Sequence, residues 1–172
     1  MKNILITLGA SIAMIVMLAQ TMIEVKSNWD STSLPKDADA PPCIALHNCI
    51  RKYSDEYRIP LKYAYGVAFE ETRYQGPFHW EYKHAQTSQA GAVGPMQIMY
   101  QTAKMLFPDK NFSKEDLKND IDFNVHCSMK LLRRLYDKYG NWKLAFGAYN
   151  TGKPVVNEYS ENVYEFTAEK FK

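Results

Sequence analysis

Apolar side chains recur at helical spacing along most of the chain. From residue 43 onward they return every three or four positions, which is the pattern of helices that bury one face. Strand-like alternation is weak throughout, so we expect a mainly α domain. The pattern predicts helices over residues 44–57, 61–72, 100–107, 120–139, 142–149 and about 155–166, and a further short helix opened by a capping-box sequence at residues 113–116.

The clearest of these helices covers residues 120–139. Its apolar residues share one side, and Gly140 follows as a C-cap, so we expect it to be a core helix. The apolar stripe consists of Ile121, Val125, Met129, Leu132, Tyr136 and Tyr139.

Two stretches lack the helical pattern. Residues 74–95 are punctuated by glycine and proline and are expected to form a long loop or a small hairpin. Residues 26–42 are rich in Ser, Asp, Pro and Ala and are expected to form a linker. The linker separates an N-terminal segment, residues 1–25, from one domain over residues 43–172.

The N-terminal segment carries an apolar run over residues 4–23, after Lys2. Such a run predicts an export signal or a membrane anchor, with a buried helix of the fold as a weaker alternative. Its length is close to the roughly 20 residues that span a bilayer, while cleavage after Ala19 would put Met17 where a small residue is expected. Cleaved signal and retained anchor both stay open. Either one predicts a domain outside the cytoplasm, in the periplasm or cell envelope.

Composition narrows the class of protein. The chain has 172 residues, of which 46% are hydrophobic and 13% aromatic, enough for the core of one globular domain. The formal net charge of +2 and the dispersed Lys and Arg residues argue against a nucleic-acid-binding protein. No repeat of 20 to 50 residues is visible, which argues against a solenoid.

Three cysteines leave at least one thiol without an intramolecular disulfide partner. Cys43 and Cys49 could form a disulfide only if Cys43 lies outside the following helix, because six helical residues rise about 9 Å. Cys127 lies in the strongly helical stretch and is expected to be a buried small hydrophobe.

Glu71 is the strongest catalytic candidate. Ala64, Val67, Ala68 and Glu71 lie at i, i+3, i+4 and i+7 of one predicted helix, so the carboxyl shares a stripe with small apolar residues. Burial there would raise its pKa and keep it protonated, as a general acid must be. The adjacent Glu70 points about 100° away and cannot face the same cleft.

Two further segments carry residues that suit a binding site. Residues 91–99 place glycines and the amide of Gln97 just before a short helix, which allows close backbone approach and hydrogen bonds to a ligand. Residues 148–152 bring Tyr149 and Asn150 to a helix end. Taken alone, the first segment is better explained as an ordinary turn leading into a helix, and the second as a buried tyrosine with a capping asparagine.

Together these three segments resemble the soluble lytic transglycosylases, relatives of goose-type lysozyme. Glu71-Thr72-Arg73-Tyr74 is similar to their Glu-Ser-x-aromatic motif. The segment from Ser88 through Met99, followed by Thr102-Ala103, is similar to their Ser-x-x-Gly-Ala-x-Gly-Leu-Met-Gln-x-Met signature. Ala148-Tyr149-Asn150-Thr151-Gly152 is similar to their Ala-Tyr-Asn-Ala-Gly motif. The departures are Thr72 for Ser, Pro95 for Leu, Tyr100 for Pro and Thr151 for Ala.

A longer connection between Glu71 and Ser88 also departs from the family pattern, with the excess at about residues 76–86. Phe78, Trp80 and Tyr82 in this insertion would form either part of a sugar-stacking wall or merely a longer lobe. The insertion also holds two histidines, His79 and His84, but no cysteine or third histidine lies nearby, so no metal ion is expected. No cofactor is expected either.

The resemblance implies an α+β lysozyme-like fold, with two helical lobes and a small loop or hairpin region. It implies that Glu71 protonates the glycosidic oxygen between N-acetylmuramic acid and N-acetylglucosamine in peptidoglycan, then acts as base on the muramoyl 6-hydroxyl. The product would be a 1,6-anhydro sugar formed without water, so one carboxyl suffices where ordinary glycosidases use two.

The resemblance also implies roles for the remaining motif residues. Gln97 and the Met96 backbone would contact sugar amides, Tyr149 would orient Glu71, Asn150 would bind the saccharide beside the cleaved bond, and Ser88 would hydrogen-bond the substrate or the loop.

Two other functions stay open. A muramidase of the same fold would use water and a second carboxylate, for which Glu81 and Asp120 are the candidates. A non-catalytic wall-binding or assembly module would bind peptidoglycan without cutting it. A small anchored enzyme would suit wall opening for a secretion, conjugation or pilus machine, or a phage lysis or entry function, and the sequence does not choose among them.

Overall fold

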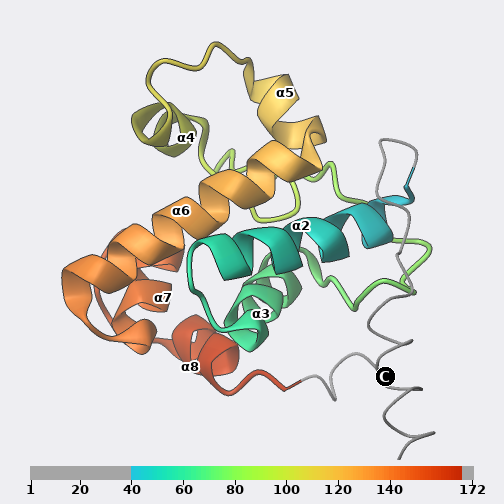
Figure 1. Cartoon of the computed structure of the whole chain (residues 1–172). Helices are drawn as coiled ribbons and strands as arrows, with labels where there is room; N and C mark the ends of the chain where they lie inside the picture. Colours follow the sequence, from blue (N-terminus) through green and yellow to red (C-terminus); the bar gives the residue numbers. More distant parts are fainter. Residues whose placement is uncertain (1–39, 168–172) are drawn as a thin grey trace, which may run out of the picture. The chain divides into compact units, whose positions relative to one another are not determined.

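The structure is a computed structural model that describes residues 40–167 (Figure 1). The predicted segments 1–25 and most of 26–42 lie outside the described residues. Seven helices, labelled as in Figure 1, make up the described part: α2 (Pro42–Glu56), α3 (Leu61–Thr72), α4 (Tyr100–Leu106), α5 (Lys114–Asn119), α6 (Ile121–Tyr139), α7 (Trp142–Thr151) and α8 (Glu158–Tyr164). The mainly α prediction is confirmed.

The long helix α6 runs through the middle of the domain. In Figure 1 α4 and α5 lie on one side of it, and α2, α3, α7 and α8 on the other. The loop between α3 and α4 contains only isolated bridges in the described chain, in which Val93 pairs with Thr87 and with Ile98. Of the two predicted alternatives, a long loop or a small hairpin, the structure therefore shows the long loop, with isolated bridges in it.

The ends of the helices follow from local side chains. The Asp120 carboxylate accepts a hydrogen bond from the Phe123 backbone N–H at 2.9 Å and so caps the start of α6, and Gly140, with φ of 64°, ends it. The predicted capping box at Ser113 is present. The last helix begins later than predicted, at Glu158, because the Asn157 side chain caps it there.

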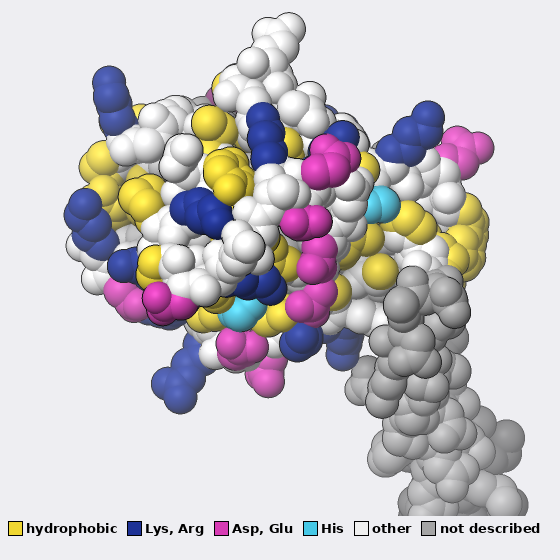
Figure 2. All heavy atoms as spheres, turned by 90° about the horizontal axis from the view of Figure 1, so that it is seen from above, with side chains coloured by type: hydrophobic (Ala, Val, Ile, Leu, Met, Phe, Trp, Pro, Cys, Tyr) yellow, Lys and Arg dark blue, Asp and Glu magenta, His cyan; other side chains and the backbone are white. Residues whose placement is uncertain are grey.

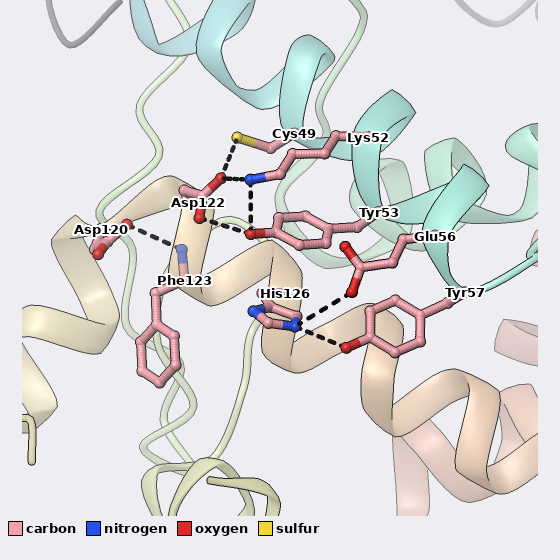
Figure 3. Close-up of polar contacts among 9 residues, drawn as sticks. All are labelled: Cys49, Lys52, Tyr53, Glu56, Tyr57, Asp120, Asp122, Phe123 and His126. Atoms are coloured by element: carbon pink, nitrogen blue, oxygen red, sulfur yellow. Dashed lines mark hydrogen bonds and ion pairs between the residues drawn. The ribbon is translucent and has the colours of Figure 1, made fainter. Parts of the chain in front are cut away.

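Helix α2 is held against α6 by a group of polar and aromatic side chains (Figure 3). Tyr53 donates a hydrogen bond to Asp122 at 2.7 Å, and the Lys52 ammonium lies 2.9 Å from the same carboxylate. The His126 ring stacks on Tyr53, with centroids 4.5 Å apart, and lies 2.7 Å from the Tyr57 hydroxyl. Asp122 and His126 lie about 200° around α6 from Asn124 and Ser128, which face the motif residues described below.

The cysteines are all free thiols. Cys43 lies inside α2 together with Cys49, so the condition for a disulfide between them is not met. Cys127 is fully buried in α6, as predicted for a small hydrophobe.

The apolar run at residues 4–23 lies outside the described residues, so the prediction of a signal or anchor stays a prediction. Among the described helices none is both long and apolar enough to span a membrane. The face seen in Figure 2 carries basic and acidic side chains together, in keeping with the small net charge of the chain.

Candidate active site

Glu71 lies in the last turn of α3, on the predicted stripe. Ala64, Val67 and Ala68 are completely buried, while Glu71 at the end of the stripe keeps partial contact with solvent. The carboxyl therefore sits at the edge of the core, where water solvates it poorly.

The hydroxyl of Tyr159, on α8, donates a hydrogen bond to Glu71 Oε1 at 2.7 Å. Burial raises the pKa of Glu71 to about 7, and this effect outweighs the hydrogen bond from Tyr159, which favours the ionised form. A carboxyl with such a pKa is present in both protonation states near neutral pH, as an acid that later becomes a base must be.

Two charged neighbours on the same helix end act on Glu71 in opposite directions. The nearby charge of Glu70 raises the pKa of Glu71, and that of Arg73 lowers it. Glu70 is itself a largely buried carboxylate, 10% exposed, paired with the Arg73 guanidinium at 3.3 Å. Arg73 adopts a left-handed conformation, with φ of 58°, as it caps α3.

Close contact between α3 and the C-terminal end of α8, with the residues just after it, brings α8 and its Tyr159 beside Glu71. Gly66 makes this contact possible, because a Cβ at this position would lie 3.0 Å from Phe166 Cβ and 3.1 Å from the Val163 carbonyl oxygen. Tyr159 falls within the helix predicted at about residues 155–166, and that pattern alone gives it no role in the site. A buried tyrosine hydroxyl needs a hydrogen-bond partner, and this was the one available signal for its role.

Thr72 joins α3, the helix that carries Glu71, to the glycine-containing loop at residues 91–99. Its hydroxyl donates to the Pro95 carbonyl at 2.9 Å and lies 2.7 Å from the hydroxyl of Tyr82. The residue that replaces the family's serine thus fixes the loop beside Glu71, through a backbone carbonyl that any residue at position 95 would supply.

Asn124, which is fully buried in α6, holds the same loop at Val93 and Met96, while Thr72 of α3 holds it at Pro95. Its side-chain oxygen accepts from Met96 N–H at 2.9 Å, and its amide donates to the carbonyls of Val93 and Leu117, both at 2.9 Å. Gly94 passes so close that a Cβ there would lie 2.3 Å from the Asn124 amide nitrogen. The sequence pattern does not indicate this role of Asn124, since one polar residue in a helix is usually exposed.

Tyr149 supports the loop rather than Glu71 directly. Its hydroxyl donates to the Met96 carbonyl at 2.7 Å and lies 2.8 Å from Ser128 Oγ. Burial first, and then the charge of Glu71, raises the pKa of Tyr149 far above its usual value. The hydrogen bond to the Glu71 carboxyl comes from Tyr159, and the orienting role that the resemblance implies for Tyr149 stays a prediction.

The Met96 backbone uses both of its polar groups inside the protein, on Asn124 and Tyr149. A sugar contact there would have to use the second lone pair of the carbonyl. Gln97 has a positive φ of 49°, and its amide donates to the Gly94 carbonyl at 2.8 Å, so its side-chain oxygen is the group left to face a ligand.

The other two predicted site residues make local contacts. The Ser88 hydroxyl accepts from Ala92 N–H at 3.1 Å and so closes the turn before the loop, one of the two roles expected of it. Asn150 is exposed near the end of α7, and its side-chain oxygen accepts from the Asn157 amide at 3.1 Å. Gly152, and not Asn150, caps α7.

Neither candidate for a second carboxylate is placed by its contacts to act with Glu71. Asp120 caps α6, and Glu81 is exposed on the insertion. Within residues 40–167 no cluster of His, Cys, Asp and Glu side chains could hold a metal ion.

Comparison with known proteins agrees with this arrangement. The family described as "Transglycosylase SLT domain" matches residues 48–172. No curated protein matches the chain. Among solved structures, the 70-kDa soluble lytic transglycosylase in complex with bulgecin A is 26% identical over 68% of this chain, with a TM-score of 0.51.

The 70-kDa soluble lytic transglycosylase of Escherichia coli is 25% identical over 72% of this chain, again with a TM-score of 0.51. The matched region spans only 18% and 20% of those two longer chains. The family match covers well over half of the present sequence, and the chain therefore belongs to the transglycosylase SLT domain family, with its lysozyme-like fold.

Proposed function

We propose that this protein is a peptidoglycan lytic transglycosylase that cleaves the β-1,4 bond between N-acetylmuramic acid and N-acetylglucosamine. The observation that carries the proposal is the Glu71 carboxyl, whose pKa burial raises to about 7 and whose Oε1 atom Tyr159 holds at 2.7 Å. The family membership and the two structural neighbours support the same class of enzyme.

In the proposed reaction the protonated Glu71 gives its proton to the glycosidic oxygen as the bond to the muramic acid C1 breaks. The resulting carboxylate takes the proton of the muramoyl 6-hydroxyl, whose oxygen attacks C1 and closes the 1,6-anhydro ring. The proton count balances without water, so one carboxyl performs both steps. Tyr159, as a hydrogen-bond donor, stabilises the carboxylate between them.

The contacts of the other carboxylates favour this reaction over hydrolysis. A muramidase that inverts or retains configuration uses a second carboxylate facing the first across the bond. Asp120 is committed to a helix cap, Glu81 is exposed, and Glu70 is paired with Arg73. The proposal therefore assigns Gln97, Asn150 and the loop around Met96 to the sugars, and the acid–base chemistry to Glu71 alone.

The identity of the released sugar tests the proposal. Residues 27–172 would be incubated with purified insoluble peptidoglycan, and the soluble products would be identified by mass spectrometry. Anhydro-muropeptides support the transglycosylase. Products with a reducing end would show a muramidase, and binding without soluble products would show a non-catalytic wall-binding module.

The rate should depend on pH through Glu71. Because the protonated carboxyl is the acid, and its pKa in the folded protein is about 7, kcat/KM should fall as the pH rises through 7, by about tenfold per unit at higher pH. The measurement is the initial rate of product release from pH 5 to 9. Glu70→Gln removes a charge that raises this pKa, so the fall should begin at a lower pH. A rate that increases from pH 7 to 9 would contradict the assignment.

Tyr159→Phe should lower kcat by about tenfold, because it removes a hydrogen bond of about 1.5–3 kcal/mol to the ionised carboxyl. It should also move the alkaline fall in kcat/KM to higher pH, because this hydrogen bond lowers the pKa of Glu71. Tyr164→Phe, on the same helix but 38% exposed, is the control and should change neither quantity. A purely structural role would leave the pH profile in place.

We further propose that the enzyme works outside the cytoplasm, in the periplasm or cell envelope. The support is the apolar run at residues 4–23, followed by a linker whose composition suits a tether. Retention of that run would anchor the enzyme in the inner membrane, beside a secretion, conjugation or pilus machine that needs a local opening in the wall.

A further inference from the structure

The insertion at residues 76–86 exposes two aromatic rings. Phe78 is 73% exposed and Trp80 62%, and their ring centroids lie 6.3 Å apart at an interplanar angle of 61°. Apolar side chains left together on a surface commonly mark a place where something binds. Neither ring has a part in the chemistry assigned to Glu71.

Buried side chains below the exposed rings hold the insertion in place. Tyr82 is 5% exposed, its hydroxyl lies 2.7 Å from Thr72 Oγ1, and its ring packs edge-on against Tyr74 at 5.1 Å. Backbone hydrogen bonds from His79 to Gly76 and from Tyr82 to His79 close two turns around the aromatic pair. The tip of the insertion is thus built on a packed foundation, and this limits the entropy that binding would cost.

Both ends of the insertion join the candidate active site. It starts after the helix turn that carries Glu71, and at its far end the Gln86 carbonyl accepts from Gly94 N–H at 2.9 Å, within the loop of Gln97. Phe78 is the sixth residue after Thr72, so the chain keeps its backbone within about 22 Å of the end of α3. A polymer that extends from the site can reach it.

We propose that Phe78 and Trp80 form a stacking surface for sugar rings of the glycan strand, beyond the bond that is cleaved. This inference rests on the proposed function. A pyranose ring has a C–H-rich face that packs on an aromatic plane, while its hydroxyls remain in water. The exposed Glu81 and Lys83 beside the rings suit such a half-hydrated ligand.

The size of the surface also favours a sugar. Two aromatic side chains bury about 150–250 Å² each, well below the roughly 1,000 Å² that a stable protein interface needs. A sugar polymer can be held by small contacts repeated along its length, because each further contact acts at high effective concentration.

A binding experiment without turnover tests the surface. In a Glu71→Gln background, Phe78→Ala with Trp80→Ala should weaken co-sedimentation with insoluble peptidoglycan by about tenfold. Met105→Ala in the same background is the matched control, because Met105 is 71% exposed on α4, and it should bind like its parent. Thermal unfolding should be the same in all three, since every changed side chain is exposed.

In the active chain the double substitution should raise KM on long glycan strands and leave kcat on short fragments unchanged. Binding within twofold of the parent, while the wild-type chain still releases anhydro-muropeptides, would overturn the stacking surface alone. Loss of binding to anionic lipid vesicles, with peptidoglycan binding intact, would likewise overturn it in favour of a membrane contact. A wild-type chain that neither binds nor cuts peptidoglycan would overturn the proposed function and the surface with it.

Discussion

Glu71→Gln is expected to lower the rate of glycan cleavage by about 10²- to 10⁴-fold, the usual contribution of general acid–base catalysis. Glutamine has nearly the same shape and can still accept the hydrogen bond from Tyr159, but it cannot donate and recover a proton at this position. The measurement is the rate of release of soluble muropeptides at pH 6, where the wild-type carboxyl is mostly protonated.

The fold should not suffer from this substitution, and above pH 7 it should gain. The pKa of Glu71 rises from an ordinary 4.5 in the unfolded chain to about 7 in the folded one. Below pH 4.5 the carboxyl is protonated in both states and costs the fold nothing. Between pH 4.5 and 7 it ionises more readily in the unfolded chain, so the free energy of unfolding falls as the pH rises through this range. The uncharged variant avoids this loss, so its free energy of unfolding at pH 8 should exceed that of the wild type by about 1–3 kcal/mol.

Glu70→Gln is the matched control, because it makes the same chemical change one residue earlier. It should keep most of the activity at pH 6, since Glu70 is paired with Arg73 and does not carry the transferred proton. A Glu71→Gln variant that retains more than a few per cent of the rate, or a Glu70→Gln variant that loses it equally, would show that the acid has been assigned to the wrong residue.

The longer helices could be predicted from the sequence because each of them buries one face along its length. Helix α3 starts and ends at the predicted residues. Helix α6 starts one residue later than predicted and ends at the predicted Gly140 cap, since Pro60, Asp120 and Gly140 act locally. The late start of α8 shows that the apolar pattern alone does not fix where a helix begins. Val155 and Val156 fit an apolar stripe, yet both are about half exposed, and the Asn157 cap decides where the helix begins.

The candidate site could be predicted only in part. Glu71 stood out because a carboxyl on a stripe of small apolar residues is unusual. Tyr159 and Asn124 did not, because their roles come from contacts across 88 and 28 residues, and local patterns carry no information on such pairs. Thr72 and Pro95 looked like departures from the family pattern, and the structure shows that they bind each other.

The same contacts show that the residues of the loop at 91–99 have two roles, binding the ligand and fixing the loop. Met96 lies in the motif that the resemblance assigns to sugar binding, yet its backbone is held by Asn124 and by Tyr149. A motif found in sequence thus combines groups that touch the ligand with groups that fix the loop, and only the hydrogen bonds separate them. Gln97 belongs to the first kind through its side-chain oxygen.

Asn124→Ala should be the most destabilising of the substitutions considered for this domain. It leaves the Met96 N–H and the Leu117 carbonyl without their Asn124 partner, while the Val93 carbonyl loses one of its two hydrogen bonds and keeps that from the Ile98 N–H. Each unsatisfied group costs about 1–3 kcal/mol, so we expect a total loss of about 3–5 kcal/mol, measured by urea unfolding. Because the loop beside Glu71 loses its anchor, cleavage should also fall. Asn119→Ala is the control: its amide bonds Glu115 on the surface, and its loss should cost less than about 0.5 kcal/mol.

Gly94 offers a second check on the same contact. Gly94→Ala alone should destabilise strongly, because the residue has φ of 77° and its new Cβ would lie 2.3 Å from the Asn124 amide. In the Asn124→Ala background that collision is absent and only the backbone strain remains. In a double-mutant cycle the double variant should therefore lose less stability than the two single variants lose together, by about 1 kcal/mol or more. Strict additivity would mean that Asn124 does not hold the loop, and the stability of the site would then have to come from the Thr72–Pro95 and Tyr149–Met96 hydrogen bonds alone.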